Sequence, residues 1–139
     1  PELPITVFIN SPGGEIFSGF AIYDMLKFIS CPVTTIVTGF AASMGSILSL
    51  AADKGRRFAM PQAKIMIHQP LGGAEGQATD IKIQADEIIR IKGKLNKILA
   101  KRTGQKISKV EKDSDRNYFM SPTEAKIYGI IDTVLASRK

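Results

Sequence analysis

The sequence has very few of the side chains that bind metals or form disulfides. It contains one cysteine, Cys31, one histidine, His68, and no tryptophan. A single cysteine cannot form an internal disulfide, and one cysteine with one histidine cannot build a zinc site of the usual spacing. We therefore expect no structural metal and no cofactor, and this composition fits a reducing compartment.

Long apolar runs and a one-sided charge distribution are also missing. No segment reaches the ~18 uninterrupted apolar residues of a membrane span. The net charge is +6, but the basic residues are spread over 54–57, 82–112 and the C-terminal tail and alternate with acidic ones. This pattern indicates a solvated surface. We expect neither a membrane nor a nucleic acid among the partners.

The sequence does contain strand-like and helix-like segments in alternation. β-Branched runs predict strands within 3–10, 33–38, 57–60, 64–68 and 129–135, and helical spacing or a capping box predicts helices at 16–28, 44–52, 78–102, 108–113 and from 122. Residues 69–77 are predicted to form a loop, because they contain a proline and three glycines. Such alternation predicts an α/β layered fold, and the length predicts one domain over 1–139.

The helix predicted at 78–102 is unusually long for a chain of this size. About 25 residues at 1.5 Å each span some 37 Å, which is more than a small domain needs for its own core. We expect part of this helix to contact a partner.

Ser43 is the best candidate for a nucleophile. It lies in the segment Gly39–Ser46 (GFAASMGS), where a strand is expected to turn sharply into a helix through residues too small to cover the hydroxyl. The surrounding A-S-M-G differs from the G-x-S-x-G pattern of hydrolases, so the motif test alone fails. Packing of small residues against a helix is the alternative.

His68 is the candidate general base, because a serine hydroxyl needs a positioned base and the chain has no second histidine. It ends an apolar strand and precedes a glycine-rich loop; a structural histidine is the alternative. The amides of Gly14 and Met44 could hold an oxyanion, because the glycines of 12–14 let the backbone approach a ligand. Simple chain reversal is the alternative for that turn.

Four segments, in order and at matching spacing, resemble the signature blocks of the ClpP family: 10–14 (NSPGG), 39–45 (GFAASMG), 66–73 (MIHQPLGG) and 76–80 (GQATD). The likeness continues through 116–121 and 124–132 and so covers essentially the whole chain. The resemblance implies a ClpP/crotonase-like layered fold with a protruding handle helix, the handle covering about 69–103.

The same resemblance implies roles for individual residues. Ser43 would be the nucleophile and His68 the base, the amides of Gly14 and Met44 would form the oxyanion hole, and the substrate would pair along an edge with the residues Gln69, Pro70 and Leu71. Phe8, Phe28 and Leu135 match positions that line the docking pocket for a Clp AAA+ ATPase; burial in the core is the alternative for these three.

The chain departs from the family in two places. ClpP subunits normally begin with some fifty more residues, so we expect that the segment before Pro1 has been clipped or left out. Asn117 stands where the family has the third triad residue, an Asp. Its carbonyl could hold the tautomer of His68 but brings no charge, and its N–H would select the wrong tautomer. Asp113 and Asp115 remain as substitutes, although the family uses the position of Asp115 in inter-ring ion pairs.

The resemblance implies a cytoplasmic serine endopeptidase subunit of a compartmentalised, ATP-dependent protease. It would form a heptamer and a double heptamer. Such a ring would contain either this chain alone or this chain together with a paralogue. Unfolded polypeptides would be fed by an AAA+ unfoldase, because the chain has no phosphate-binding loop of its own.

Two other functions remain. Asn117 motivates a weakly active structural or regulatory subunit of a mixed ring. An acyl-CoA enzyme of the crotonase superfamily is disfavoured, because Glu15 is the only carboxylate next to the oxyanion turn.

Overall fold

Strands and helices alternate along the chain, as the sequence predicts. The computed structural model describes residues 3–68 and 75–136. Its elements, in order, are β1 (Ile5–Ser11), α1 (Ile16–Phe28), β2 (Val33–Ala42), α2 (Met44–Ser49), β3 (Arg57–Ala59), β4 (Lys64–Ile67), α3 (Ala78–Thr103), α4 (Ile107–Asp113), β5 (Tyr118–Met120), α5 (Pro122–Tyr128) and β6 (Thr133–Val134).

β2 is the central strand of the sheet. One of its edges pairs with β1, while its other edge pairs first with β3 and then, closer to its carboxyl end, with β4. β6 extends the sheet beyond β3, and β5 extends it beyond β4. All these pairings are parallel except β4–β5. The carboxyl ends of β1, β2 and β4 therefore lie at the same edge, which is where parallel α/β sheets place their ligand sites.

The core lies between the sheet and the helices. Its fully buried side chains come from β2, β4, β5, α2, α4 and the segment before β6, and the largest of them are Val33, Val37, Leu50, Ile65, Ile67, Val110, Met120, Ile130 and Ile131. α1 packs closely on α2, because Gly19 leaves the space that the side chain of Met44 fills. Close packing of this kind fixes where α2, and the turn that precedes it, sit on the sheet.

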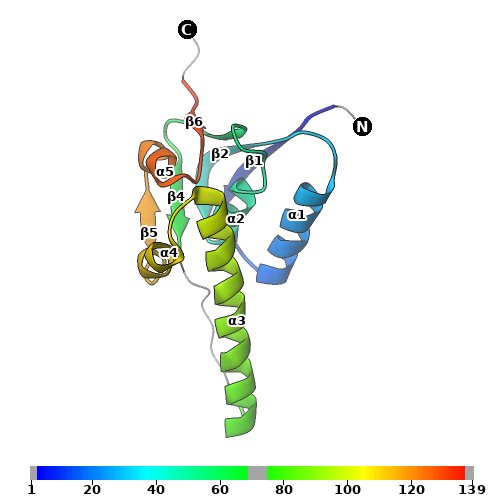
Figure 1. Cartoon of the computed structure of the whole chain (residues 1–139), viewed down its shortest axis with the longest axis vertical. Coiled ribbons are helices and arrows are strands. Elements are labelled where there is room, and N and C mark those ends of the chain that lie inside the picture. Colours follow the sequence, from blue (N-terminus) through cyan, green and yellow to red (C-terminus); the bar gives the residue numbers. More distant parts are fainter. Residues whose placement is uncertain (1–2, 69–74, 137–139) are drawn as a thin grey trace.

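α3 is only partly attached to this core. Ile91, Leu95 and Leu99 are buried, whereas Ile83 and Ile89, nearer its start, are 62% and 65% exposed. In Figure 1 the first half of α3 projects away from the sheet, and the two termini lie at the opposite end of the molecule. The helix ends at Gly104 in the left-handed conformation, as expected of a glycine cap. The prediction of one long helix at 78–102 is thus confirmed.

The largest differences from the sequence prediction are the ends of β2 and α2 and the presence of β5. β2 continues to Ala42, because its small residues pair with β4. α2 ends at Ser49 and not at residue 52, since the N–H groups of Leu50 and Ala51 turn to the tighter three-residue pattern. β5 was not predicted; a strand of three residues is too short to show a periodicity.

A buried ion pair joins three parts of the fold. Arg57 on β3 is 3% exposed and donates two hydrogen bonds to the carboxylate of Asp132, just before β6, while its third nitrogen binds the carbonyl of Arg102 on α3. Burial opposes ionisation of Asp132, but the hydrogen bonds from Arg57 and Gly55 outweigh it and hold its pKa below the usual value.

We predict that Asp132→Asn destabilises the protein by about 3 kcal/mol, because it leaves the Arg57 cation buried without a counter-charge. Urea denaturation at neutral pH measures the change. Since the folded-state pKa of Asp132 is lowered, the difference between the two proteins is full above the unfolded pKa of about 3.9 and vanishes as the pH falls through the lower folded value.

The matched control is Asp86→Asn, which removes an exposed pair with Lys82 and should change stability by less than about 0.5 kcal/mol. Equal effects of the two substitutions would contradict the assigned role of Asp132.

Candidate active site

Three parallel strands deliver the candidate residues to one edge of the sheet. Ser43 directly follows β2, His68 directly follows β4, and the Pro12–Gly14 turn follows β1. The register places Ala42 opposite Met66 and Ser11 opposite Ala41. Residues that are some 30 and 55 positions apart in sequence are thus neighbours because their strands end together.

The backbone at Ser43 has an unusual conformation. Its φ and ψ are 57° and −119°, and among the described residues no other residue except glycine has a positive φ. Its N–H donates to the carbonyl of Met66 on β4 at 3.0 Å, and its own carbonyl accepts from the N–H groups of Ser46 and Ile47. The strand-to-helix turn is therefore held from both sides, and it presents the half-buried side chain at its corner.

The Pro12–Gly14 turn lies directly against this corner. A Cβ atom on Gly13, whose φ is 99°, would lie 2.9 Å from both the carbonyl oxygen of Ala42 and the Cβ of Ser43. Only glycine allows this approach. Within the described part of the chain, no hydrogen bond uses the N–H of Gly14 or of Met44. Both amides are thus available to an anionic oxygen beside Ser43.

His68 is oriented by Asn117. Its Nδ1 lies 3.0 Å from Oδ1 of Asn117, so Nδ1 carries the proton and donates it, and Nε2 is left as the basic nitrogen. The strand β5 creates this contact: its antiparallel pairing with β4 sets Tyr118 opposite Ile67, and the preceding Asn117 comes beside His68. Of the two arrangements open to Asn117, the carbonyl acceptor is the one present.

Asp113, one of the proposed substitutes, has another role. Its Oδ2 accepts from Nζ of Lys109 at 2.8 Å and from the hydroxyl of Tyr128 at 3.0 Å. Burial and this hydrogen bond raise the pKa of Tyr128 above its ordinary value, so the hydroxyl stays a donor. These two contacts hold Asp113 at the end of α4. The side chain at Nδ1 of His68 is that of Asn117 and not that of Asp113.

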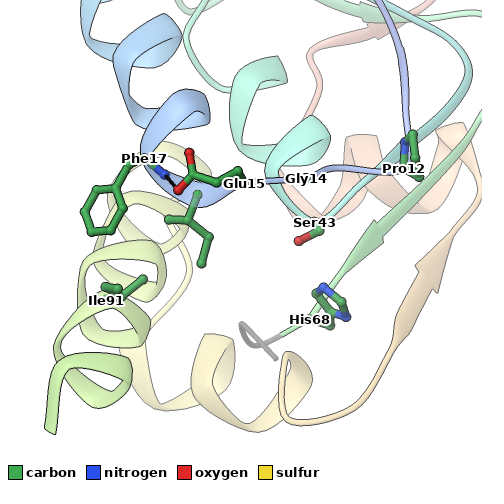
Figure 2. A pocket seen from close by; sticks show the side chains of 8 residues that line it. Pro12, Gly14, Glu15, Phe17, Ser43, His68 and Ile91 are labelled. Atoms are coloured by element: carbon green, nitrogen blue, oxygen red, sulfur yellow. Dashed lines mark hydrogen bonds between the residues drawn. The ribbon is translucent and has the colours of Figure 1, made fainter. Parts of the chain in front are cut away.

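Ser43 and His68 line a pocket of about 420 Å³, shown in Figure 2. The other lining residues come from the β1–α1 segment and from α3: Pro12, Gly14, Glu15, Ile16, Phe17 and Ile91. Within residues 3–68 and 75–136, no hydrogen bond joins the Ser43 hydroxyl to His68. A general base acts at hydrogen-bond distance or through one water, so this pair would have to approach or be bridged for a proton to pass between them.

The predicted substrate-binding residues Gln69, Pro70 and Leu71 lie outside the described residues. Among the residues that are described, no group of three His, Cys, Asp or Glu side chains could hold a metal ion. In the same part of the chain, no helix has the length and hydropathy to cross a bilayer.

A protein-family model described as Clp protease matches residues 1–138. The chain belongs to the Clp protease family. With the mixed α/β sheet and the projecting α3, the match confirms the ClpP/crotonase-like fold and makes the chain a ClpP-type peptidase. Membership of this family also implies assembly into rings that work with Clp ATPases.

The sequence analysis missed part of the wall of this ClpP-type pocket. Ile16 and Phe17 lie at the start of α1, and Ile91 lies on α3 where the helix leaves the core. Their apolar character was visible in the sequence, but it looked like ordinary helix periodicity. Only the packing of α3 against the core brings Ile91 to the pocket that Ile16 also lines.

We predict that Ser43→Gly is more stable than Ser43→Ala by about 1 kcal/mol, because glycine relieves the strained backbone that alanine keeps. Both variants remove the hydroxyl, and neither loses a capping bond, since the Ser43 side chain caps nothing. Urea denaturation of the two variants gives the difference. An alanine variant at least as stable as the glycine variant would show that residue 43 is unstrained.

Proposed function

We propose that this ClpP-type subunit is a serine endopeptidase with Ser43, His68 and Asn117 as its catalytic residues. The observation that carries the proposal is the His68–Asn117 hydrogen bond at the edge of the pocket that Ser43 also lines. It assigns the Nδ1 proton of His68 to the bond with Asn117, so Nε2, on the ring edge away from Asn117, is the nitrogen that would act as the base.

In the proposed reaction, Nε2 of His68 takes the Ser43 proton while the serine oxygen attacks the peptide carbonyl. The N–H groups of Gly14 and Met44 stabilise the oxyanion of the tetrahedral intermediate. The C–N bond then breaks, the imidazolium returns its proton to the leaving amine, and an acyl-enzyme remains. Water activated by His68 hydrolyses the ester and restores the Ser43 hydroxyl.

Two groups of exposed apolar side chains support the proposed partners. Phe8 and Phe28 are 68% and 84% exposed, and Leu135 is half-buried. The alternative that these residues are simply core is therefore wrong for the two phenylalanines. Their exposure leaves them open to a partner, as the proposed docking of a Clp AAA+ ATPase requires.

The projecting half of α3 supports the assembly of two rings. Ile81, Ile83 and Ile89 are exposed there, so contact with a second heptamer would bury them. We propose a heptamer and a double heptamer, either of one chain or mixed with a paralogue, in the cytoplasm. Unfolded polypeptides would bind along residues 69–71, in one peptidase domain that spans 1–139.

The test is labelling of the purified chain with a fluorophosphonate probe, followed by mass spectrometry to locate the adduct. We expect the adduct on Ser43 and at least a hundredfold slower labelling in His68→Ala, since general-base catalysis contributes about 10²–10⁴-fold. Labelling of another serine, or labelling that His68→Ala leaves unchanged, would contradict the proposal.

Asn117 favours one alternative, a weakly active structural or regulatory subunit in a mixed ring. An amide orients the base but does not stabilise the imidazolium that forms during attack. Cleavage of a peptide by the purified chain, without a second subunit, would decide against this alternative.

We predict that Asn117→Asp raises kcat/KM for a short peptide at least about tenfold, because a carboxylate at this distance stabilises the imidazolium by more than about 1.4 kcal/mol. Asn117→Ala should lower the same constant, since His68 then loses the acceptor that holds its tautomer. If the aspartate variant matches the wild type, Asn117 does not limit the site.

A further inference from the structure

A cavity of about 340 Å³ lies where the ends of α3 and α5 meet the start of β3. One carboxylate lines it, that of Asp132, and its cationic side chains are Lys54, Arg57, Lys101, Arg102 and Lys126. Five positive charges and one negative charge leave a net of four, out of a net charge of +6 for the whole sequence. By comparison, the groove lined by Phe17 and Phe20 has two lysines and one aspartate. The fold thus gathers at one place cations that are scattered along the sequence.

Close contacts hold the three segments around this cavity. Gly129, which ends α5 with a φ of 106°, lies so near the carbonyl group of Thr103 at the end of α3 that a Cβ atom would overlap it. Only glycine permits both this approach and this φ. Arg57 donates to the carbonyl of Arg102 at 2.9 Å, which ties the end of α3 to the sheet. The backbone positions from which the cationic side chains start are therefore fixed.

The single carboxylate of the cavity is already neutralised. The two oxygens of Asp132 accept from the guanidinium of Arg57, and Oδ2 also accepts from the backbone N–H groups of Gly55 and Arg57. Within residues 3–68 and 75–136, no ion pair joins an acidic group to the four remaining cations, which are Lys54, Lys101, Arg102 and Lys126. Their charge is therefore not compensated by the protein.

Arg102 supplies a fixed part of this charge. Its Nε donates to the carbonyl of Leu50 at 3.0 Å, and one of its terminal nitrogens donates to the carbonyl of Ala52. These bonds hold the half-buried side chain beside the cavity, but a carbonyl group brings no net negative charge. The three lysines are exposed, and their flexible four-carbon stems let the ammonium groups turn toward an anion. One fixed cation and three adaptable ones suit an anion with several charged oxygens.

The pKa of Lys27 reflects the same excess of positive charge. Lys27 lies on α1, outside the cavity. Burial lowers its pKa most, and the positive charges of Arg102 and Lys101 lower it further, while Asp53 opposes them. Like charges that accumulate in this way destabilise a compact structure. An anion bound among them would relieve the repulsion.

We propose that this cavity binds an anion that contains a chain of two or more phosphate groups. One phosphate group brings about two negative charges at neutral pH, whereas the cavity has four uncompensated positive charges. Its volume lies at the lower end of the range for small-ligand sites, about 300–1,000 Å³, so a compact phosphate chain fits it better than an extended polymer. A free polyphosphate and the phosphate chain of a nucleotide share this chemistry. The proposal does not depend on the peptidase activity.

Isothermal titration calorimetry of the full chain with inorganic triphosphate, in the absence of divalent cations, tests this proposal. We expect one site per chain and an affinity that falls as salt is raised, because salt screens exposed charges. Inorganic phosphate should bind at least about tenfold more weakly, since it meets fewer of the lysines. Absence of saturable triphosphate binding, or equal affinity for the two anions, would overturn the proposal.

The double variant Lys101→Gln/Lys126→Gln should weaken triphosphate binding at least about tenfold, because each exposed ion pair contributes up to about fivefold. The matched control is Lys92→Gln/Lys112→Gln, which has the same net charge but loses two lysines of a different groove, between α3 and α4. Its affinity should stay within about twofold of the wild type, since screening weakens the effect of more distant charges. Equal losses in the two variants would show a diffuse effect of net charge and would contradict a site in this cavity.

Two further ligands distinguish the sources of the anion. If ATP without divalent cations binds as tightly as triphosphate, the phosphate chain alone is recognised and a free polyphosphate suffices. Markedly tighter binding of ATP would instead identify a nucleotide as the source. A short polyglutamate peptide that binds more tightly than triphosphate would contradict a phosphate ligand and identify an acidic polypeptide as the partner.

Discussion

The site depends on one backbone constraint, the positive φ of Ser43 where β2 passes into α2. The conformation is costly for a residue with a Cβ atom, and it persists because the surrounding structure holds it. The carbonyl of Met66 fixes the Ser43 N–H, the first turn of α2 fixes its carbonyl, and Gly13 leaves room for the turn beside it. These three contacts come from β4, α2 and the turn after β1, so elements on both sides of β2 support the position of one hydroxyl.

The antiparallel pair β4–β5 supports His68, the proposed base, in the same way. Three residues of β5 suffice, because their register with β4 decides that Asn117 meets Nδ1 of His68. The amide of Asn117 accepts the Nδ1 proton of His68 as the aspartate of a triad would, but it carries no negative charge. It can therefore orient the imidazole without stabilising an imidazolium. The candidate site thus has its histidine oriented by Asn117, while no hydrogen bond joins Ser43 to His68 among the described residues.

α3 joins this site to the surface on which assembly is proposed. Its second half packs into the core through Leu95 and Leu99, and Ile91, where the helix leaves the core, lines the pocket that Ser43 and His68 also line. Its first half exposes isoleucines beyond the sheet. One helix therefore contributes both to the pocket wall and to the projecting apolar surface.

The sequence by itself determined the alternation of elements, the long helix and the family, and it supplied Ser43 and His68 as candidates, since each depends on local periodicity or on a short motif. It could not determine that β2 continues through its small residues to Ala42, that β5 exists, or which group of Asn117 faces His68, because these follow from pairing between strands far apart in the chain. The tertiary structure also decided the exposure of Phe8 and Phe28 and the meeting of Glu15 with Ile91 at one pocket. Periodicity shows that a residue is apolar or charged, but only the packed chain decides which surface it faces.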